Sequence, residues 1–166
     1  LKFNNTEDSK VLSNNRDYEE FFLKAPILKE AFKMLGKPYL WGGRSSQGYD
    51  CSGLIQTCMH LLGFQFPRDA KDQVDSELLY EIELKDTFSG DLLFFEENSS
   101  VTHVAIAVDN FDIIRGSLVC SGEIIHSSGT VKISKIVFND MHYGVIDKNN
   151  KSKMKLYKVM RLIENA

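Results

Sequence analysis

The sequence is poor in several features that mark whole classes of protein. It holds only three cysteines, and none of them form a C-x-x-C pair, which argues against a structural zinc site or a thioredoxin-like redox site. No apolar run approaches the roughly 20 residues that a membrane-spanning helix needs. The net charge is only −3, which gives no general attraction to nucleic acid or to an anionic membrane surface.

Cysteine is scarce enough that each thiol can be considered separately. Three cysteines cannot all pair within one chain, so at most one disulfide could form, and we expect free thiols. The sequence begins with Leu1 rather than Met, so we expect a processed or trimmed chain.

What is present fits a globular domain with a substantial core. The 166 residues are 43% hydrophobic and 26% charged, which is ordinary for a soluble domain. We expect an N-terminal arm and helix over residues 1–26 and a single domain over residues 27–166. Within the first segment, Asp17 is a possible helix cap, and Pro26 is typical of the first turn of a second helix.

The sequence pattern of the second half of the chain predicts β-strands. Apolar or alternating runs predict strands at 92–95, 101–108, 123–126, 131–138 and about 154–162. Helices followed by a run of antiparallel strands predict an α+β fold, with the helices packed on the sheet. The lysines near the end of the chain suggest that the last strand is an edge strand, where lysine prevents pairing with other chains.

A glycine-rich loop over residues 36–50 leads into an apolar helix that begins near Cys51. Asp50 occupies the position of a helix N-cap, and Gly53 leaves room for a substrate backbone. A helix N-terminus and a nearby imidazolium can lower the pKa of a thiol, and backbone N–H groups at this position can bind an oxyanion. Cys51 is therefore the candidate nucleophile, whereas Cys58 and Cys120, the latter in a turn-like stretch, are interpreted as non-catalytic.

Two histidines on predicted strands are candidates to assist Cys51. His103 follows a turn and is placed as a rigid general base. If its strand pairs with that of His126, the second ring can fix the tautomer of the first, as in a catalytic triad. We interpret His60 as structural and His142 as a surface residue.

Six segments of the chain occur in a familiar order: Tyr39-Leu40-Trp41-Gly42-Gly43, Asp50-Cys51-Ser52-Gly53-Leu54, Pro67-Arg68 with Gln73, Gly90-Asp91-Leu92-Leu93-Phe94-Phe95, His103-Val104-Ala105-Ile106 and Ile125-His126-Ser127. Together they resemble the NlpC-type family of bacterial cell-wall cysteine peptidases. The resemblance covers about residues 27–138, and the last strand also fits. It implies a papain-like fold, with the cysteine helix packed on an antiparallel sheet.

The resemblance also implies an activity. Members of the family hydrolyse the amide between γ-D-glutamate and the following diamino acid, meso-diaminopimelate or lysine, in peptidoglycan stem peptides or muropeptides. By that pattern Cys51 is the nucleophile, His103 the base and His126 the orienting residue. Tyr39, Asp50 and Ser52 would bind the substrate, including a free L-Ala amine where one is required. No metal or organic cofactor is implied, and the expected location is the cell envelope or outside the cell, with a cytoplasmic role in wall recycling as the alternative.

Other functions stay open on the sequence alone. The same fold could serve as a catalytically silent wall-binding or regulatory module, or as a thiol-dependent amidase or acyltransferase. His103 and His126 also lie farther apart along the chain than the two histidines of the family usually do, which predicts an insertion near residues 109–122.

Overall fold

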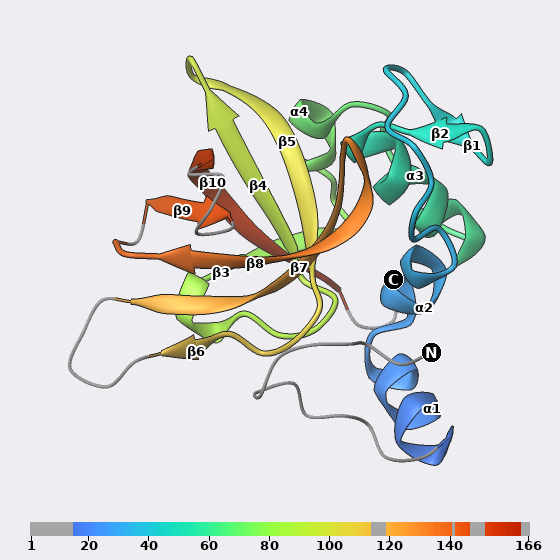
Figure 1. Ribbon diagram of the computed structural model, residues 1–166, viewed down its shortest axis with the longest axis horizontal. Helices are drawn as coiled ribbons and strands as arrows, with labels where there is room; N and C mark the ends of the chain where they lie inside the picture. Colours follow the sequence, from blue (N-terminus) through green and yellow to red (C-terminus); the bar gives the residue numbers. More distant parts are fainter. Residues whose placement is uncertain (1–14, 114–118, 141, 147–151, 164–166) are drawn as a thin grey trace.

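The computed structural model describes residues 15–113, 119–140, 142–146 and 152–163. Four α-helices lie along one side of a strongly curved sheet (Figure 1). Most of the predicted N-terminal arm lies outside the described residues, as do residues 147–151.

The helices are short and have local causes. They are α1 (Asn15–Lys24), α2 (Pro26–Phe32), α3 (Cys51–Leu61) and α4 (Ala70–Gln73), with a 3₁₀ helix, η1 (Leu84–Asp86), before the main strands. Pro26 stands in the first turn of α2, as predicted. Asp17 is inside α1 rather than at its cap, because that helix begins at Asn15.

The strands form two sheets. The small one pairs β1 (Arg44–Ser45) with β2 (Gly48–Tyr49). The large one contains β3 (Leu79–Ile82), β4 (Leu92–Glu97), β5 (Ser100–Ala107), β6 (Asp112–Ile113), β7 (Cys120–Ser128), β8 (Thr130–Phe138), β9 (Tyr143–Ile146) and β10 (Ser152–Leu162). Its ladders are antiparallel, as expected, in the order β3-β10-β4-β5-β7-β8-β9.

The large sheet closes on itself, which the sequence did not predict. β9 pairs with β10 as well as with β8, so the strands from β10 round to β9 form a barrel. The prediction that the last strand is an edge strand is wrong, since β10 pairs with β3, β4 and β9. Its lysines instead pair with glutamates on the neighbouring strands, Lys155 with Glu96 and Lys158 with Glu81.

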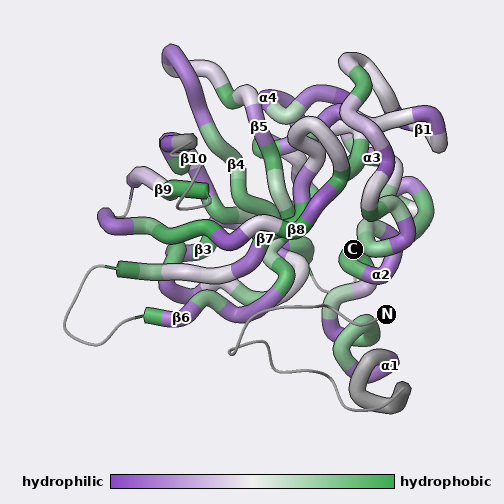
Figure 2. The backbone as a smooth tube through the Cα atoms, in the orientation of Figure 1, coloured by the Kyte–Doolittle hydropathy of each residue, from purple (hydrophilic) through white to green (hydrophobic). Residues whose placement is uncertain are grey.

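Alternation along the strands separates two hydrophobic cores, an outer core between the helices and the sheet and an inner core inside the barrel. On β5, Val104 and Ile106 face the helices, whereas Ala105 and Ala107 face the inside of the barrel, as the sequence pattern predicts. Figure 2 shows hydrophobic residues along β4 and β5. Fully burying a Leu or Ile side chain stabilises the fold by about 1.5–3 kcal/mol.

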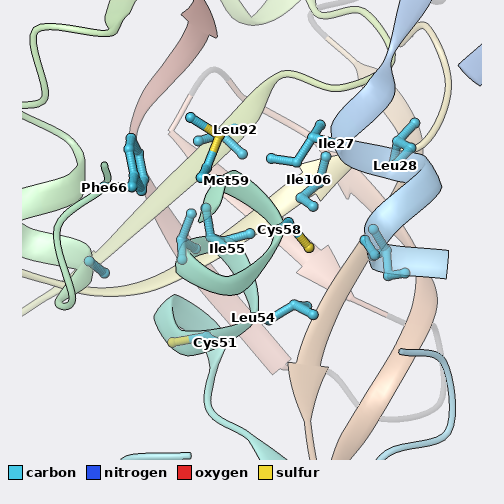
Figure 3. Close-up of a cluster of buried hydrophobic side chains, with 14 of the residues drawn as sticks. Ile27, Leu28, Cys51, Leu54, Ile55, Cys58, Met59, Phe66, Leu92 and Ile106 are labelled. Carbon is cyan, nitrogen blue, oxygen red and sulfur yellow. The ribbon is translucent and has the colours of Figure 1, made fainter. Parts of the chain in front are cut away.

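Helix α3 is fixed against the barrel by the outer core. Figure 3 shows Leu54, Ile55 and Met59 of this helix among Leu92 and Ile106 of β4 and β5. Because Leu54 and Ile55 are completely buried, the rotation and position of α3 are determined by packing. The position of Cys51, at the start of that helix, follows from this packing.

The segment predicted to be an insertion contributes β6 and the first part of β7. Residues 114–118, between them, lie outside the described residues. Phe111 packs on the Phe138 ring and lies directly over Gly122, where a side chain would collide with it. Cys120 lies in a strand and is buried in the barrel, so the expectation of a turn at this position is wrong.

Candidate active site

The first turn of α3 is built by the glycine-rich loop. The Asp50 carboxylate accepts a hydrogen bond from the Gly53 N–H at 2.7 Å, which is the predicted N-cap. The Gly43 carbonyl accepts from the Asp50 N–H at 3.1 Å and lies against Gly53, where no side chain would fit. Cys51 therefore stands in a first turn whose geometry is fixed from outside the helix.

Asp50 does more than cap the helix. Its carboxylate also accepts from the Gly42 N–H at 2.9 Å and forms a forked ion pair with Arg68 at 2.6 and 3.0 Å. Arg68 therefore already binds both carboxylate oxygens of Asp50, the residue expected to bind a substrate amine.

Arg68 is a site residue to which the sequence reasoning gave no role, although it stood within the quoted Pro67-Arg68 motif. It donates to the Ser52 hydroxyl at 3.0 Å in addition to Asp50. Gln73 holds the same segment from α4, donating through Nε2 to the carbonyls of Ser52 and Pro67 at 2.9 Å each. The signal available in the sequence was Asp50 at a helix N-cap, followed by Arg68 directly after Pro67.

The Cys51 sulfur lies at an open edge of β5. It contacts the Thr102 carbonyl at 3.7 Å, and the Val104 N–H favours its ionised form, so it faces the backbone on both sides of His103. The edge is open because the ladder between β5 and β7 pairs Ile106 with Ile125 and Ala107 with Ile124, and the two strands then diverge. The N-terminus of α3 thus meets β5 beside the histidine.

The predicted contact between the histidines is present. His103 Nε2 lies 2.9 Å from His126 Nδ1, and the rings meet edge to face. His126 Nε2 lies 3.0 Å from the Ser134 hydroxyl on β8. His103 also contacts the Phe95 ring, which belongs to the inner core, so the pair projects from the barrel side of β5.

The environment keeps these groups neutral. Burial lowers the pKa of His103 to about 4; burial together with the charges of His103 and Lys132 lowers that of His126 to about 3. Burial raises the pKa of the Cys51 thiol, and Asp50 adds to the effect. The expectation of a lowered thiol pKa is therefore wrong for this state, because burial outweighs the backbone N–H groups around the sulfur.

A cleft of about 200 Å³ opens beside the thiol. Its walls include Tyr39, Asp50 and Ser52, the three residues expected to bind substrate, together with Trp41 and Cys51. Trp41 is 87% exposed and stands at the rim. The described residues thus bring Cys51 and the expected substrate-binding residues to one surface.

The remaining candidates lie apart from this cleft. All three cysteines are free thiols, as expected, and burial raises the pKa of Cys58 to about 12. His60 and His142 are exposed. Within the part of the chain that the structure describes, no group of three or more His, Cys, Asp or Glu side chains is arranged to hold a metal ion, and no helix is long and apolar enough to cross a membrane.

Comparison with known proteins identifies several relatives. The chain is 41% identical over 88 residues to the bifunctional muramidase/DL-endopeptidase CwlT of Bacillus subtilis (strain 168), covering 51% of this chain and 26% of that protein. It is 36% identical over 114 residues to the gamma-D-glutamyl-L-lysine dipeptidyl-peptidase of the same organism, covering 67% and 34%. The chain thus spans about a quarter to a third of these relatives.

A solved structure and a family model agree with these matches. A protein described as similar to lipoprotein, NLP/P60 family, from Staphylococcus aureus subsp. aureus Mu50, superposes with a TM-score of 0.60 at 28% identity, over 96% of this chain and 46% of that one. The fold is therefore α+β and papain-like, with a barrel for its sheet. The NlpC/P60 family model matches residues 36–149, which include α3, both histidines and most of the barrel. The chain belongs to the NlpC/P60 family.

Proposed function

We propose that this chain is a cysteine peptidase that hydrolyses the γ-D-glutamyl–diamino acid amide of peptidoglycan stem peptides, with meso-diaminopimelate or lysine as the diamino acid. Cys51 is the nucleophile, His103 the general base and His126 the orienting residue. The observation that carries the proposal is the position of the Cys51 sulfur against the backbone on both sides of His103, whose ring is held by His126. The name of the gamma-D-glutamyl-L-lysine dipeptidyl-peptidase of Bacillus subtilis supports the same bond, and the DL-endopeptidase name of the other relative supports a peptidase activity.

The reaction starts from a neutral thiol and a neutral imidazole. His103 contacts His126 through Nε2, which leaves Nδ1 to take the thiol proton. The sulfur must first exchange the Thr102 carbonyl for this nitrogen. As the proton moves, the sulfur bonds to the γ-carbonyl carbon, and the carbonyl oxygen becomes an oxyanion that the Cys51 N–H and the Tyr39 hydroxyl stabilise.

The two remaining steps return the enzyme to its starting state. The tetrahedral intermediate collapses when the C–N bond breaks and the His103 imidazolium gives its proton to the leaving amine, which leaves a thioester on Cys51. Water then gives a proton to His103 and attacks the thioester carbonyl. The carboxylic acid departs as the thiol regains its proton.

Tyr39, Asp50 and Ser52 are proposed to bind the substrate, including an L-Ala amine. All three border the cleft beside Cys51. Since Arg68 already binds the Asp50 carboxylate and the Ser52 hydroxyl, an incoming ammonium would share these acceptors with the guanidinium. Such sharing favours ligands that also carry a carboxylate, which the guanidinium can attract.

Product analysis on defined stem peptides tests the proposal. Each peptide is supplied with a free amino end or as the muramyl conjugate, and the products are identified by mass spectrometry. C51A should abolish cleavage, whereas C58A, which removes a buried thiol on the same helix, should retain it. Binding without cleavage by the unaltered chain would favour a silent wall-binding module, and transfer to an added amine would favour an acyltransferase.

The proposed substrate sets the proposed location. We propose that the chain acts in the cell envelope or outside the cell, with recycling of wall fragments in the cytoplasm as the alternative. The Staphylococcus aureus structure, described as similar to a lipoprotein, supports the first location. Cell fractionation with an antibody against the chain tests this, and recovery in the cytoplasmic fraction alone would support the alternative.

A further inference from the structure

We propose that Ser134 is a positioning residue for the histidine pair. Its hydroxyl oxygen accepts a hydrogen bond from His126 Nε2–H and thereby holds His126 in the tautomer that can accept from His103. The inference rests on the proposed function, because it assigns Ser134 a part in that reaction. Ser134 does not border the cleft beside Cys51, so it would act through His126 rather than on the substrate.

The register of the barrel brings these residues together. The ladder between β7 and β8 pairs His126 with Lys132 and Ile124 with Ser134, so Ser134 is a diagonal neighbour of His126. Diagonal neighbours on one face lie within reach of long or aromatic side chains. Ser134 shares its face of β8 with Ile136 and Phe138 of the inner core, and so its half-buried hydroxyl points to the side on which the histidines lie.

The direction of the hydrogen bonds follows from the role of His103. A base that takes the thiol proton at Nδ1 carries its own proton on Nε2. That proton can be donated only if His126 Nδ1, 2.9 Å away, has none. His126 then carries its proton on Nε2, and the Ser134 oxygen at 3.0 Å is the acceptor.

The opposite direction would disable the base. If Ser134 donated to His126 Nε2, then His126 would carry its proton on Nδ1 and donate it to His103 Nε2. His103 would carry its proton on Nδ1, the nitrogen proposed to take the thiol proton, and could not accept another there. A hydroxyl can either donate or accept. The contact between Ser134 and His126 therefore selects the productive tautomer only together with the hydrogen bond from His103.

The nearby charges favour the same arrangement. Burial, the charge of His103 and the charge of Lys132, which lies opposite His126 on β8, all lower the pKa of His126 and disfavour its imidazolium. His126 therefore remains a neutral acceptor when His103 takes the proton. The imidazolium of His103 gains a partner whose tautomer is fixed by His103 and Ser134 together.

Substitution of Ser134 tests this by kinetics. S134A should lower kcat/KM by about 5- to 10-fold, the equivalent of one neutral hydrogen bond, mainly through kcat. Because the His103 imidazolium loses its acceptor, the acid limb of the kcat/KM profile should move to lower pH. S134T keeps the hydroxyl and should restore the value of kcat/KM and the position of the acid limb. S121A, which changes a serine elsewhere on the barrel, should leave both quantities unchanged.

A direct reading of the tautomer separates this inference from the proposed function. In ¹⁵N-histidine spectra of the intact chain near pH 7, the His126 signals should show the Nε2–H tautomer, and S134A should shift them toward a mixture. A His126 proton on Nδ1 in the unaltered chain would overturn the inference, as would S134A with unchanged spectra and kinetics. If no stem peptide is cleaved, the proposed function fails while the spectra still decide the tautomer.

Discussion

At the scale of single residues, the site depends on how each charge near Cys51 is neutralised. The Asp50 carboxylate is almost buried and would disfavour a thiolate beside it, but the Arg68 guanidinium binds it at two points. The capping role of Asp50 could be predicted from sequence because it depends on the next three residues. The partnership with Arg68 could not, because it depends on how the segment after α3 folds back.

Substitution of Arg68 should show how much the ion pair with Asp50 contributes to the stability of the fold. R68M leaves Asp50 with backbone N–H donors but without a cation, and we expect the free energy of unfolding to fall by about 2 kcal/mol. Urea denaturation measures the change. R44M, at an exposed arginine of β1, should change stability by less than about 0.5 kcal/mol, and equal losses in the two variants would contradict the account.

The two buried histidines should make the fold sensitive to mild acid. Their pKa values in the folded chain are about 4 for His103 and about 3 for His126, against about 6.5 in an unfolded chain. Between pH 6.5 and 4 the unfolded chain takes up protons that the folded chain does not, so stability is fully present above about pH 6.5 and falls toward pH 4. The loss should be on the order of a few kcal/mol.

Urea denaturation over this pH range provides the measurement. The double variant H103N/H126N should show a much shallower slope than the unaltered chain, whereas H60N, at an exposed histidine, should keep it. Equal slopes in all three proteins would show that other groups cause the acid sensitivity.

At the scale of elements, α3 is the feature on which the site depends. Its start, its apolar stripe and its end near Gly63 could all be predicted, because they reflect capping and helical period within a short segment. The side chains that share each face of β5 could also be predicted, because side chains alternate between the two faces along a strand. The open edge of β5 beside Cys51 could not, since it arises where β5 and β7 diverge.

Gly53 should be essential for the way α3 begins. Alanine would normally favour a helix over glycine by about 1 kcal/mol, but a Cβ here would collide with the Gly43 carbonyl and approach Asp50 Oδ1 to 2.8 Å. We therefore expect G53A to destabilise the chain by about 2 kcal/mol and to reduce peptide cleavage by displacing Cys51. Thermal denaturation and cleavage assays measure the two effects.

Gly63, just past the C-terminal end of the same helix, provides a matched comparison. It has a φ of +90° and open space around it, so G63A should cost only about 1 kcal/mol of backbone strain and leave cleavage intact. A G53A protein that is as stable and active as the unaltered chain would contradict the proposed fit of α3 against the loop.

At the scale of the whole molecule, the papain-like class could be inferred from ordered motifs, whereas the closure of the barrel could not. Closure requires β10 to pair with β4, which is remote in the sequence, and with β9, from which it is separated by residues 147–151. A lysine-rich strand resembles an edge strand by composition alone. Only its partners, including Glu96 and Glu81, show why the lysines are tolerated within the sheet.

The ion pair between Arg161 and Asp91 should stabilise this closure. Arg161 on β10 binds the buried Asp91 before β4 at two points, each 2.8 Å, and donates to the Asp86 carbonyl at 2.7 Å. R161M would leave a buried carboxylate without its cation, and we expect a loss of about 3 kcal/mol in urea denaturation. K158M breaks a pair on the same strand whose carboxylate, Glu81, is exposed, and it should cost less than about 1 kcal/mol. A similar loss in both variants would contradict this role.

The central claim is that the Cys51 sulfur forms a bond to the γ-carbonyl carbon of D-glutamate. Rapid acid quench of the chain with a stem peptide, followed by intact-mass and peptide mass spectrometry, tests it most directly. The account predicts a transient mass increase equal to the acyl portion of the substrate, located on Cys51 and absent from C51A. Continued hydrolysis by C51A, or an adduct on another residue, would contradict the account.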